Sequence, residues 1–134
     1  MCDITQLGTP MWMAPEIIMG KKYTEKADVY AFGIILWEIM TRLEPYDDKE
    51  PMQIVVEVVN DDLRPNIPVE YNNNILLPLM RDCWAVDPES RPSFEKIVKR
   101  LEVICNDNEL DEISKLVMYG KNKQSNSRTV SVGM

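Results

Sequence analysis

The residue types in this sequence exclude several kinds of catalytic chemistry. None of the 134 residues is histidine, which removes serine–histidine and cysteine–histidine nucleophile pairs, histidine-ligated metals and imidazole general bases. The three cysteines, Cys2, Cys83 and Cys105, are far apart and lack the short paired spacings of a zinc site or a redox pair. We therefore expect reduced thiols and assign no metal ligand.

The polar residues that remain as candidates lie in a loop and near helix ends. Residues 9–12 belong to a segment rich in glycine and proline that could equally be plain packing. Asp28 stands at the head of an apolar helix, where the helix dipole favours a negative charge. Without further context, Glu16 and Arg91 are two unrelated surface charges.

The first half of the sequence predicts one loop and two helical segments. Residues 5–15 predict a loop, and residues 16–19 predict a short helical turn closed by the glycine that follows. A longer helix starts at Thr24 or Asp28. Its residues 29–40 leave no polar face, so this helix needs neighbours on every side to bury its apolar side chains.

A further helix starts at Pro51, a residue that suits the first helical position. Its apolar residues form a wide stripe of Met52, Val55, Val56 and Val59 and a narrower stripe of Ile54 and Val58. Core packing is the usual interpretation of such a double stripe, and a docking face is the alternative. A polar loop over residues 60–74 then precedes a helix over residues 76–84.

The last predicted helix is amphipathic and has Ser93 as its N-cap. Its apolar face consists of Phe94, Ile97, Val98, Leu101, Ile104 and Cys105. Residues 106–134 become acidic and then polar, with little apolar content to bury. We expect this tail to be disordered.

The charge balance bears on possible partners. The formal net charge is −7, whereas nucleic acids and anionic membranes attract clustered lysine and arginine, so we expect neither partner. Residues 29–40 are too short to span a bilayer, and residues 1–4 have neither the basic start nor the apolar run of a signal peptide. We expect no membrane segment and a cytoplasmic location.

Four motifs in order resemble the eukaryotic protein kinases. Residues 8–16 (GTPMWMAPE) resemble the kinase loop that ends in Ala-Pro-Glu and lies beside the peptide substrate. Residues 28–38 (DVYAFGIILWE) resemble the central helix of the kinase C-lobe, and residues 45–46 (PY) and 83–94 (CWAVDPESRPSF) are familiar from the same lobe. The resemblance implies an all-α fold, the lower half of a kinase C-lobe with its substrate loop and four to five helices, and no N-lobe β-sheet.

The resemblance also suggests a group and a domain boundary. Residues 83–94 point to the tyrosine kinases or the tyrosine-kinase-like group, whereas Gly-Thr-Pro at residues 8–10 is typical of serine/threonine kinases. The sequence is therefore most similar to tyrosine-kinase-like serine/threonine kinases. By this resemblance, residues 1–105 are a partial kinase domain and residues 106–134 are the tail.

Site residues follow from the resemblance alone. The residues that would shape the pocket for the residue after the phosphorylated serine or threonine are Thr9, Pro10, Met11 and Trp12. Glu16 and Arg91 would form an ion pair that ties this loop to the segment before the last helix. Asp28 would accept hydrogen bonds from backbone N–H groups of the catalytic loop. Since that loop is missing from this sequence, we expect the Asp28 carboxylate to be solvated or to pair with a local group instead. We assign these three residues as structural anchors.

Phosphoryl transfer in the family needs a glycine-rich loop, a strand lysine, a His-Arg-Asp loop and an Asp-Phe-Gly metal site. The sequence contains none of them, since Asp3 is followed by Ile4 and Thr5. We therefore assign no catalytic or cofactor-binding residue, although full-length relatives use ATP and Mg. The leading hypothesis is a signalling serine/threonine kinase that is truncated or incomplete, with a protein substrate. The alternatives are a non-catalytic module that binds a docking partner, and a remnant without function.

Overall fold

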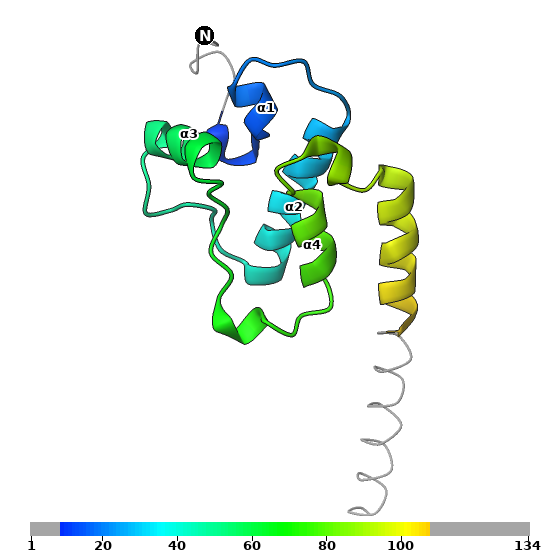
Figure 1. Cartoon of the computed structure of the whole chain (residues 1–134). Coiled ribbons are helices and arrows are strands. Elements are labelled where there is room, and N and C mark those ends of the chain that lie inside the picture. The colour runs from blue at the N-terminus through cyan, green and yellow to red at the C-terminus, as the bar shows by residue number, and fades with distance from the viewer. Residues whose placement is uncertain (1–8, 108–134) are drawn as a thin grey trace, which may run out of the picture. The chain divides into compact units, whose positions relative to one another are not determined.

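A computed structural model describes residues 9–107, and every regular element in that range is helical (Figure 1). The elements are η2 (Pro10–Trp12), α1 (Pro15–Ile18), α2 (Lys26–Thr41), α3 (Pro51–Asn60), η3 (Val69–Tyr71), α4 (Leu77–Cys83), η4 (Pro88–Ser90) and a helix over residues 94–107. Of these residues, 9–98 belong to one compact unit and 99–107 to a second. The prediction of an all-α fold without a sheet is confirmed for residues 9–107.

α1 is a single helical turn that its flanking residues define. Pro15 occupies the first position, where its missing N–H leaves no intrahelical bond unmade. Gly20 follows the turn with a φ of +68°, a left-handed conformation that favours glycine. The Lys21 N–H then donates to the Glu16 carbonyl at 2.9 Å, which closes the turn as the sequence predicts.

α2 packs against α4, the helix predicted over residues 76–84 (Figure 1). The two helices approach so closely at Gly33 that an added Cβ would lie 3.0 Å from the Cβ atom of Cys83. The Trp37 indole N–H, also buried, donates to the Asn66 carbonyl at 2.9 Å, so the polar group of this side chain is paired. The other buried side chains of α2 are Ala27, Val29, Tyr30, Ile34, Leu36 and Thr41.

The side of α2 that carries Ile35 and Ile39 is open to solvent. These two side chains are 42% and 57% exposed, so within residues 9–98 the helix lacks part of the apolar contact that its sequence needs. An apolar sequence shows which surface favours burial, but burial also requires a partner element. η2, α4 and η4 contact α2, and within residues 9–98 none of them buries Ile35 and Ile39.

α3 starts at Pro51 as predicted, and its narrower apolar stripe is the buried one. Ile54 and Val58 form a cluster with Tyr46, which we call the α3 cluster. Met11, Ile18 and Leu63 pack against this cluster. In the wide stripe, Met52 and Val56 are exposed on the other side of the helix, whereas Val55 and Val59 are half-buried.

The helix over residues 94–107 begins with the predicted cap. The Ser93 hydroxyl oxygen accepts from the Lys96 N–H at 3.3 Å. Ile97 is buried, whereas Phe94 is exposed and meets the Phe32 ring edge-on at 6.0 Å between centroids. Among residues 9–107, no helix has the length and the apolar content that crossing a bilayer requires.

Candidate functional site

The four side chains of residues 9–12 have different surroundings. Thr9 is exposed and makes no capping hydrogen bond, so its hydroxyl is open to solvent. Pro10 is buried and begins η2, which contacts both α2 and α3. Met11 is half-buried against the α3 cluster. Packing therefore fixes the middle of this loop and leaves the threonine accessible.

Trp12 ties the end of η2 to α2. Its indole N–H donates to the Glu38 carboxylate at 2.5 Å, and both groups are partly buried. An ionised acceptor makes this a charge-assisted hydrogen bond. The sequence analysis missed Glu38, although a lone carboxylate inside the otherwise apolar run 29–40 is a signal for such a partner.

An open depression of about 720 Å³ adjoins this hydrogen bond on the exposed side of α2. Its lining residues are Trp12, Ala31, Ile35, Glu38, Ile39 and Arg42. The lining combines an indole with aliphatic side chains and one charge of each sign. The surface beside the loop is therefore mostly apolar, with a polar edge.

The structure brings Glu16 and Arg91 together in a buried ion pair. Two parallel bonds join them, Nη1 to Oε1 at 2.6 Å and Nη2 to Oε2 at 3.0 Å. The residues are 6% and 1% exposed, respectively. Such a bidentate pair fixes both side chains in direction as well as in distance.

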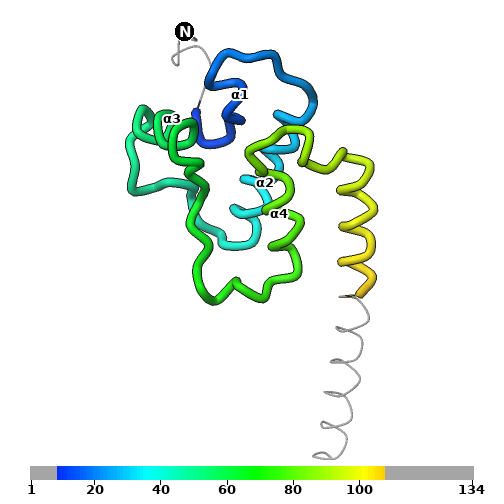
Figure 2. The backbone as a smooth tube through the Cα atoms, viewed as in Figure 1, coloured from blue at the N-terminus to red at the C-terminus, as the bar shows by residue number. Residues whose placement is uncertain are grey.

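Further hydrogen bonds connect Arg91 to the first turn of α2 and to the turn before η4. Its Nη1 also donates to the Lys26 carbonyl at 2.9 Å, and its Nε donates to the Ala85 carbonyl at 2.8 Å. In return, the Lys26 ammonium donates to the Arg91 carbonyl. Arg91 therefore joins its own segment to α1 and to the start of α2, which lie 75 and 65 residues earlier in the sequence (Figure 2).

Tyr30 lies beside this pair and was not predicted as a site residue. The Cζ atoms of Arg64 and Arg91 lie over its ring, 4.9 and 5.2 Å from the centroid, a geometry that stabilises both cations. Burial raises the pKa of the Tyr30 hydroxyl, and the nearby Arg64 charge partly opposes this effect. The aromatic ring thus replaces part of the hydration that the two guanidinium groups lose.

Asp28 lies in the first turn of α2 and is exposed. No hydrogen bond or ion pair joins its carboxylate to another of the described residues, so solvent surrounds it. Within residues 9–107, no group of three or more cysteine, aspartate or glutamate side chains could hold a metal ion. The groups near residues 9–12 offer contacts to a polypeptide: a hydroxyl, an indole and an apolar depression.

Comparison with known proteins identifies the family. Residues 4–101 match the family model described as protein tyrosine and serine/threonine kinase, so the chain belongs to the protein kinase family. It is 48% identical over 101 residues to the probable serine/threonine-protein kinase drkC of Dictyostelium discoideum, and 47% identical over 110 residues to the dual specificity protein kinase shkD of the same organism.

These two alignments cover 75% and 81% of this chain but only 13% and 15% of the relatives. A third relative, the dual specificity protein kinase shkA of the same organism, is 46% identical over 101 residues, which is 19% of its length. The chain therefore corresponds to a minor part of each of these kinases.

Proposed function

We propose that residues 9–101 form the substrate-side half of the catalytic domain of a serine/threonine kinase of the tyrosine-kinase-like group. The buried Glu16–Arg91 pair carries this proposal, because it fixes the segment that follows residues 9–12 by contacts inside this chain. The Gly-Thr-Pro sequence at residues 8–10 supports serine and threonine as the acceptors, as does the name of the relative drkC.

In this role, each residue of the loop has a part in recognising the protein substrate. The exposed Thr9 hydroxyl contacts the catalytic aspartate and the acceptor side chain, neither of which belongs to this sequence. Met11 and Trp12, which packing and the Glu38 bond hold in place, shape the pocket for the residue after the acceptor. The exposed Asp28 carboxylate, in the first turn of α2, accepts hydrogen bonds from backbone N–H groups of the catalytic loop in the complete kinase domain.

We further propose that this 134-residue chain by itself binds no ATP-Mg and transfers no phosphate. Transfer requires groups that cradle the nucleotide, hold the metal and orient the acceptor, and the sequence has no histidine for a His-Arg-Asp loop and no Asp-Phe-Gly. ATP and Mg then bind residues that lie outside this sequence. The three cysteines lie far apart in the sequence and lack short paired spacings, which supports a reducing compartment such as the cytoplasm.

A chimaera tests the proposed activity. In drkC, the segment aligned with residues 9–101 is replaced by these residues, and phosphorylation of serine, threonine and tyrosine peptides is measured. We expect activity on serine and threonine peptides, a clear loss on Thr9→Val, and little change on Tyr23→Phe, which removes an exposed hydroxyl outside the loop. A folded chimaera that is inactive, or that prefers tyrosine, would refute the proposal.

The 134-residue chain alone provides the second arm of this test. We expect no rise of its melting temperature with ATP-Mg and no phosphate transfer to any of the peptides. A nucleotide-dependent rise would contradict the proposed lack of ATP binding, and transfer by a preparation free of other kinases would contradict the lack of activity.

A non-catalytic interaction module is the second candidate function. The observation that favours it is the exposure of Met52 and Val56 on α3, because exposed apolar side chains on a helix of a folded unit often mark a site for a protein partner. This candidate requires no nucleotide. It is distinguished by binding measurements on the chain alone.

A further inference from the structure

The negative charge of this protein is concentrated around α3. Residues 43–63 contain seven aspartate and glutamate residues and one lysine, a local charge of −6, whereas the whole chain has a net charge of −7. The remaining residues are therefore almost neutral as a group. A surface partner would encounter the excess negative charge mainly at α3 and its flanking loops.

Nearly all of these carboxylates face solvent. The exposed ones are Glu44, Asp47, Asp48, Glu50, Asp61 and Asp62. Glu57 is half-buried and forms an ion pair with Lys49 at 2.9 Å, which neutralises the local lysine. The exposed carboxylates thus lie before and after α3 and leave both ends of the helix negatively charged.

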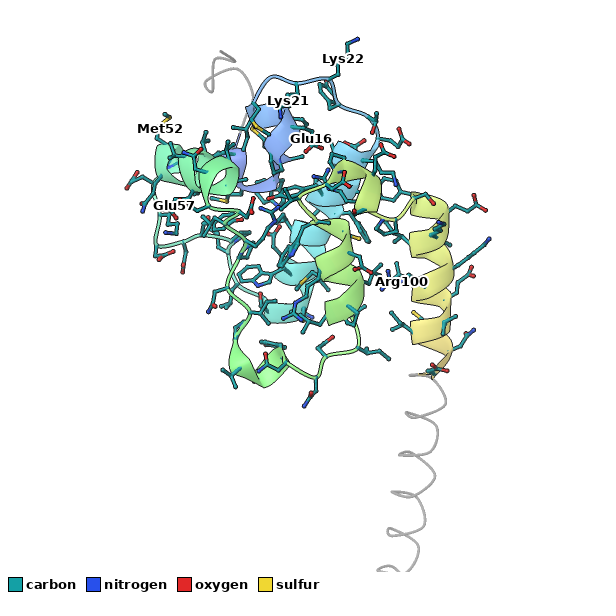
Figure 3. The ribbon with its side chains drawn as sticks, viewed as in Figure 1. Glu16, Lys21, Lys22, Met52, Glu57 and Arg100 are labelled. Carbon is teal, nitrogen blue, oxygen red and sulfur yellow. The ribbon has the colours of Figure 1, made fainter. Side chains whose placement is uncertain are left out.

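An apolar stripe lies between the two groups of carboxylates. Met52 is 58% exposed and Val56 is 49% exposed, and they lie one helical turn apart. The α3 cluster covers the other side of the helix through Ile54 and Val58. We call Met52, Val56 and the flanking carboxylates the α3 surface; Figure 3 shows Met52 and Glu57 on α3 at the edge of the ribbon.

We infer that the α3 surface docks a basic amphipathic segment of a partner protein, in which lysine or arginine residues flank an apolar stripe. Burying Met52 and Val56 against apolar side chains supplies the driving force. The carboxylates at both ends of α3 select positive flanks and reject acidic ones. A second copy of this chain fits poorly, because a two-fold contact through α3 would bring the two acidic surfaces together.

Two exposed lysines near α3 carry the opposite charge to the α3 surface. Lys21 and Lys22 follow α1, which contacts α3, and Lys22 projects away from the fold (Figure 3). They lie outside the acidic segment 43–63, so their charge opposes the basic partner rather than attracting it. Neutralising them is therefore a matched control for changes of charge on the α3 surface.

The test uses the 134-residue chain and a labelled helical peptide of lysine and leucine, about 15 residues long so that it can form an amphipathic helix. Two reference peptides have the same length: one has glutamate in place of lysine, and one has a scrambled order. Fluorescence anisotropy measures the dissociation constants, and amide chemical shifts locate the bound peptide. We expect the amphipathic lysine peptide to bind at residues 47–62 and the glutamate peptide not to bind.

Variants separate the two parts of the surface. We expect Asp47→Asn with Asp48→Asn and Glu50→Gln to weaken binding about tenfold, and Met52→Ser with Val56→Thr to weaken it by a similar factor. Lys21→Gln with Lys22→Gln should leave binding unchanged or slightly stronger. All changed residues are exposed, and circular dichroism verifies the fold of each variant.

Several results would overturn the inference. If the scrambled peptide binds equally well, or if the Met52 and Val56 variant retains full affinity, the attraction is non-specific charge. Shifts outside residues 47–62, the absence of binding, or self-association of the chain through α3 would each show that this surface has another role. The inference does not depend on phosphoryl transfer, so its failure leaves the chimaera experiment unaffected.

Discussion

Removing Glu16 should destabilise the chain strongly. The Arg91 guanidinium is 1% exposed, so removing its carboxylate partner leaves a cation in a poorly solvated site. Breaking a buried ion pair in this way costs about 3–5 kcal/mol of the free energy of unfolding. We expect Glu16→Ala to fall in this range.

Removing Arg91 should cost more than removing Glu16. Arg91→Ala leaves the Glu16 carboxylate buried, and it also removes donors to the Lys26 and Ala85 carbonyls and the cation over the Tyr30 ring. The double variant strands no charge, so its effect should be smaller than the sum of the two single effects by about 1–3 kcal/mol.

Urea denaturation followed by far-ultraviolet circular dichroism measures these values on the 134-residue chain, with a stabilising osmolyte present if a variant is partly unfolded in buffer. The control is the same cycle on Lys49 and Glu57, a solvent-accessible pair for which we expect a much smaller coupling. Additive effects of the Glu16 and Arg91 changes would refute the reasoning, because they would mean that the two side chains do not interact.

Three further predictions concern packing and ionisation. Gly33→Ala should destabilise the chain by about 1–3 kcal/mol, because its Cβ would approach the Cβ atom of Cys83 to 3.0 Å; unchanged stability in urea denaturation would contradict the close packing of α2 and α4. Burial raises the pKa of Tyr30, so folding is favoured while the phenol is neutral. This contribution to stability is fully present below the ordinary tyrosine pKa of 10.0 and is lost as pH rises above it. In an ultraviolet titration, the Tyr30 phenol should ionise only on unfolding, and its ionisation in the folded state would contradict its burial. The hydrogen bond from Lys49, followed by that from Gln53, lowers the pKa of Glu57 below 4.5. The ionised Glu57 therefore stabilises the fold above pH 4.5, and this contribution is lost as pH falls through the lowered pKa. Lys49→Met should raise the pKa of Glu57 in a carbon-detected titration, and an unchanged pKa would exclude the Lys49–Glu57 ion pair.

The helices were largely predictable because their signals are local. Pro51 at a first helical position, Ser93 as an N-cap and the glycine that closes α1 each act within one turn of the chain. The unbroken apolar run of α2 and the polar loop before α4 are likewise visible in a continuous stretch of sequence. Such features depend on neighbouring residues, which a single sequence displays in full.

Burial was harder to predict, since it depends on elements distant in the sequence. The two stripes of α3 are both apolar, and the sequence analysis described the one with Met52 and Val56 as the wider. The structure buries the other, because Met11, Ile18 and Leu63 pack from the side of Ile54 and Val58. Periodicity shows that a helix has apolar faces, but the approaching element decides which of them becomes core.

The arrangement around Arg91 shows how far family resemblance extends beyond periodicity. From the sequence pattern alone, Glu16 and Arg91 are two unrelated charges, whereas the family resemblance predicts that they form an ion pair. In the structure, Arg91 Nη1 lies 2.6 Å from Glu16 Oε1. Neither periodicity nor resemblance indicated a role for Tyr30 in this site, because an aromatic residue in an apolar helix is normally a core residue. Its second function follows from burial: two guanidinium groups withdrawn from water need a polarisable neighbour, and an aromatic ring on α2 provides it for Arg64 and Arg91 together. The same residue therefore belongs to the core by volume and to the ion-pair site by its electrostatics, and replacing it with leucine would keep an apolar side chain in the core while removing that electrostatic support.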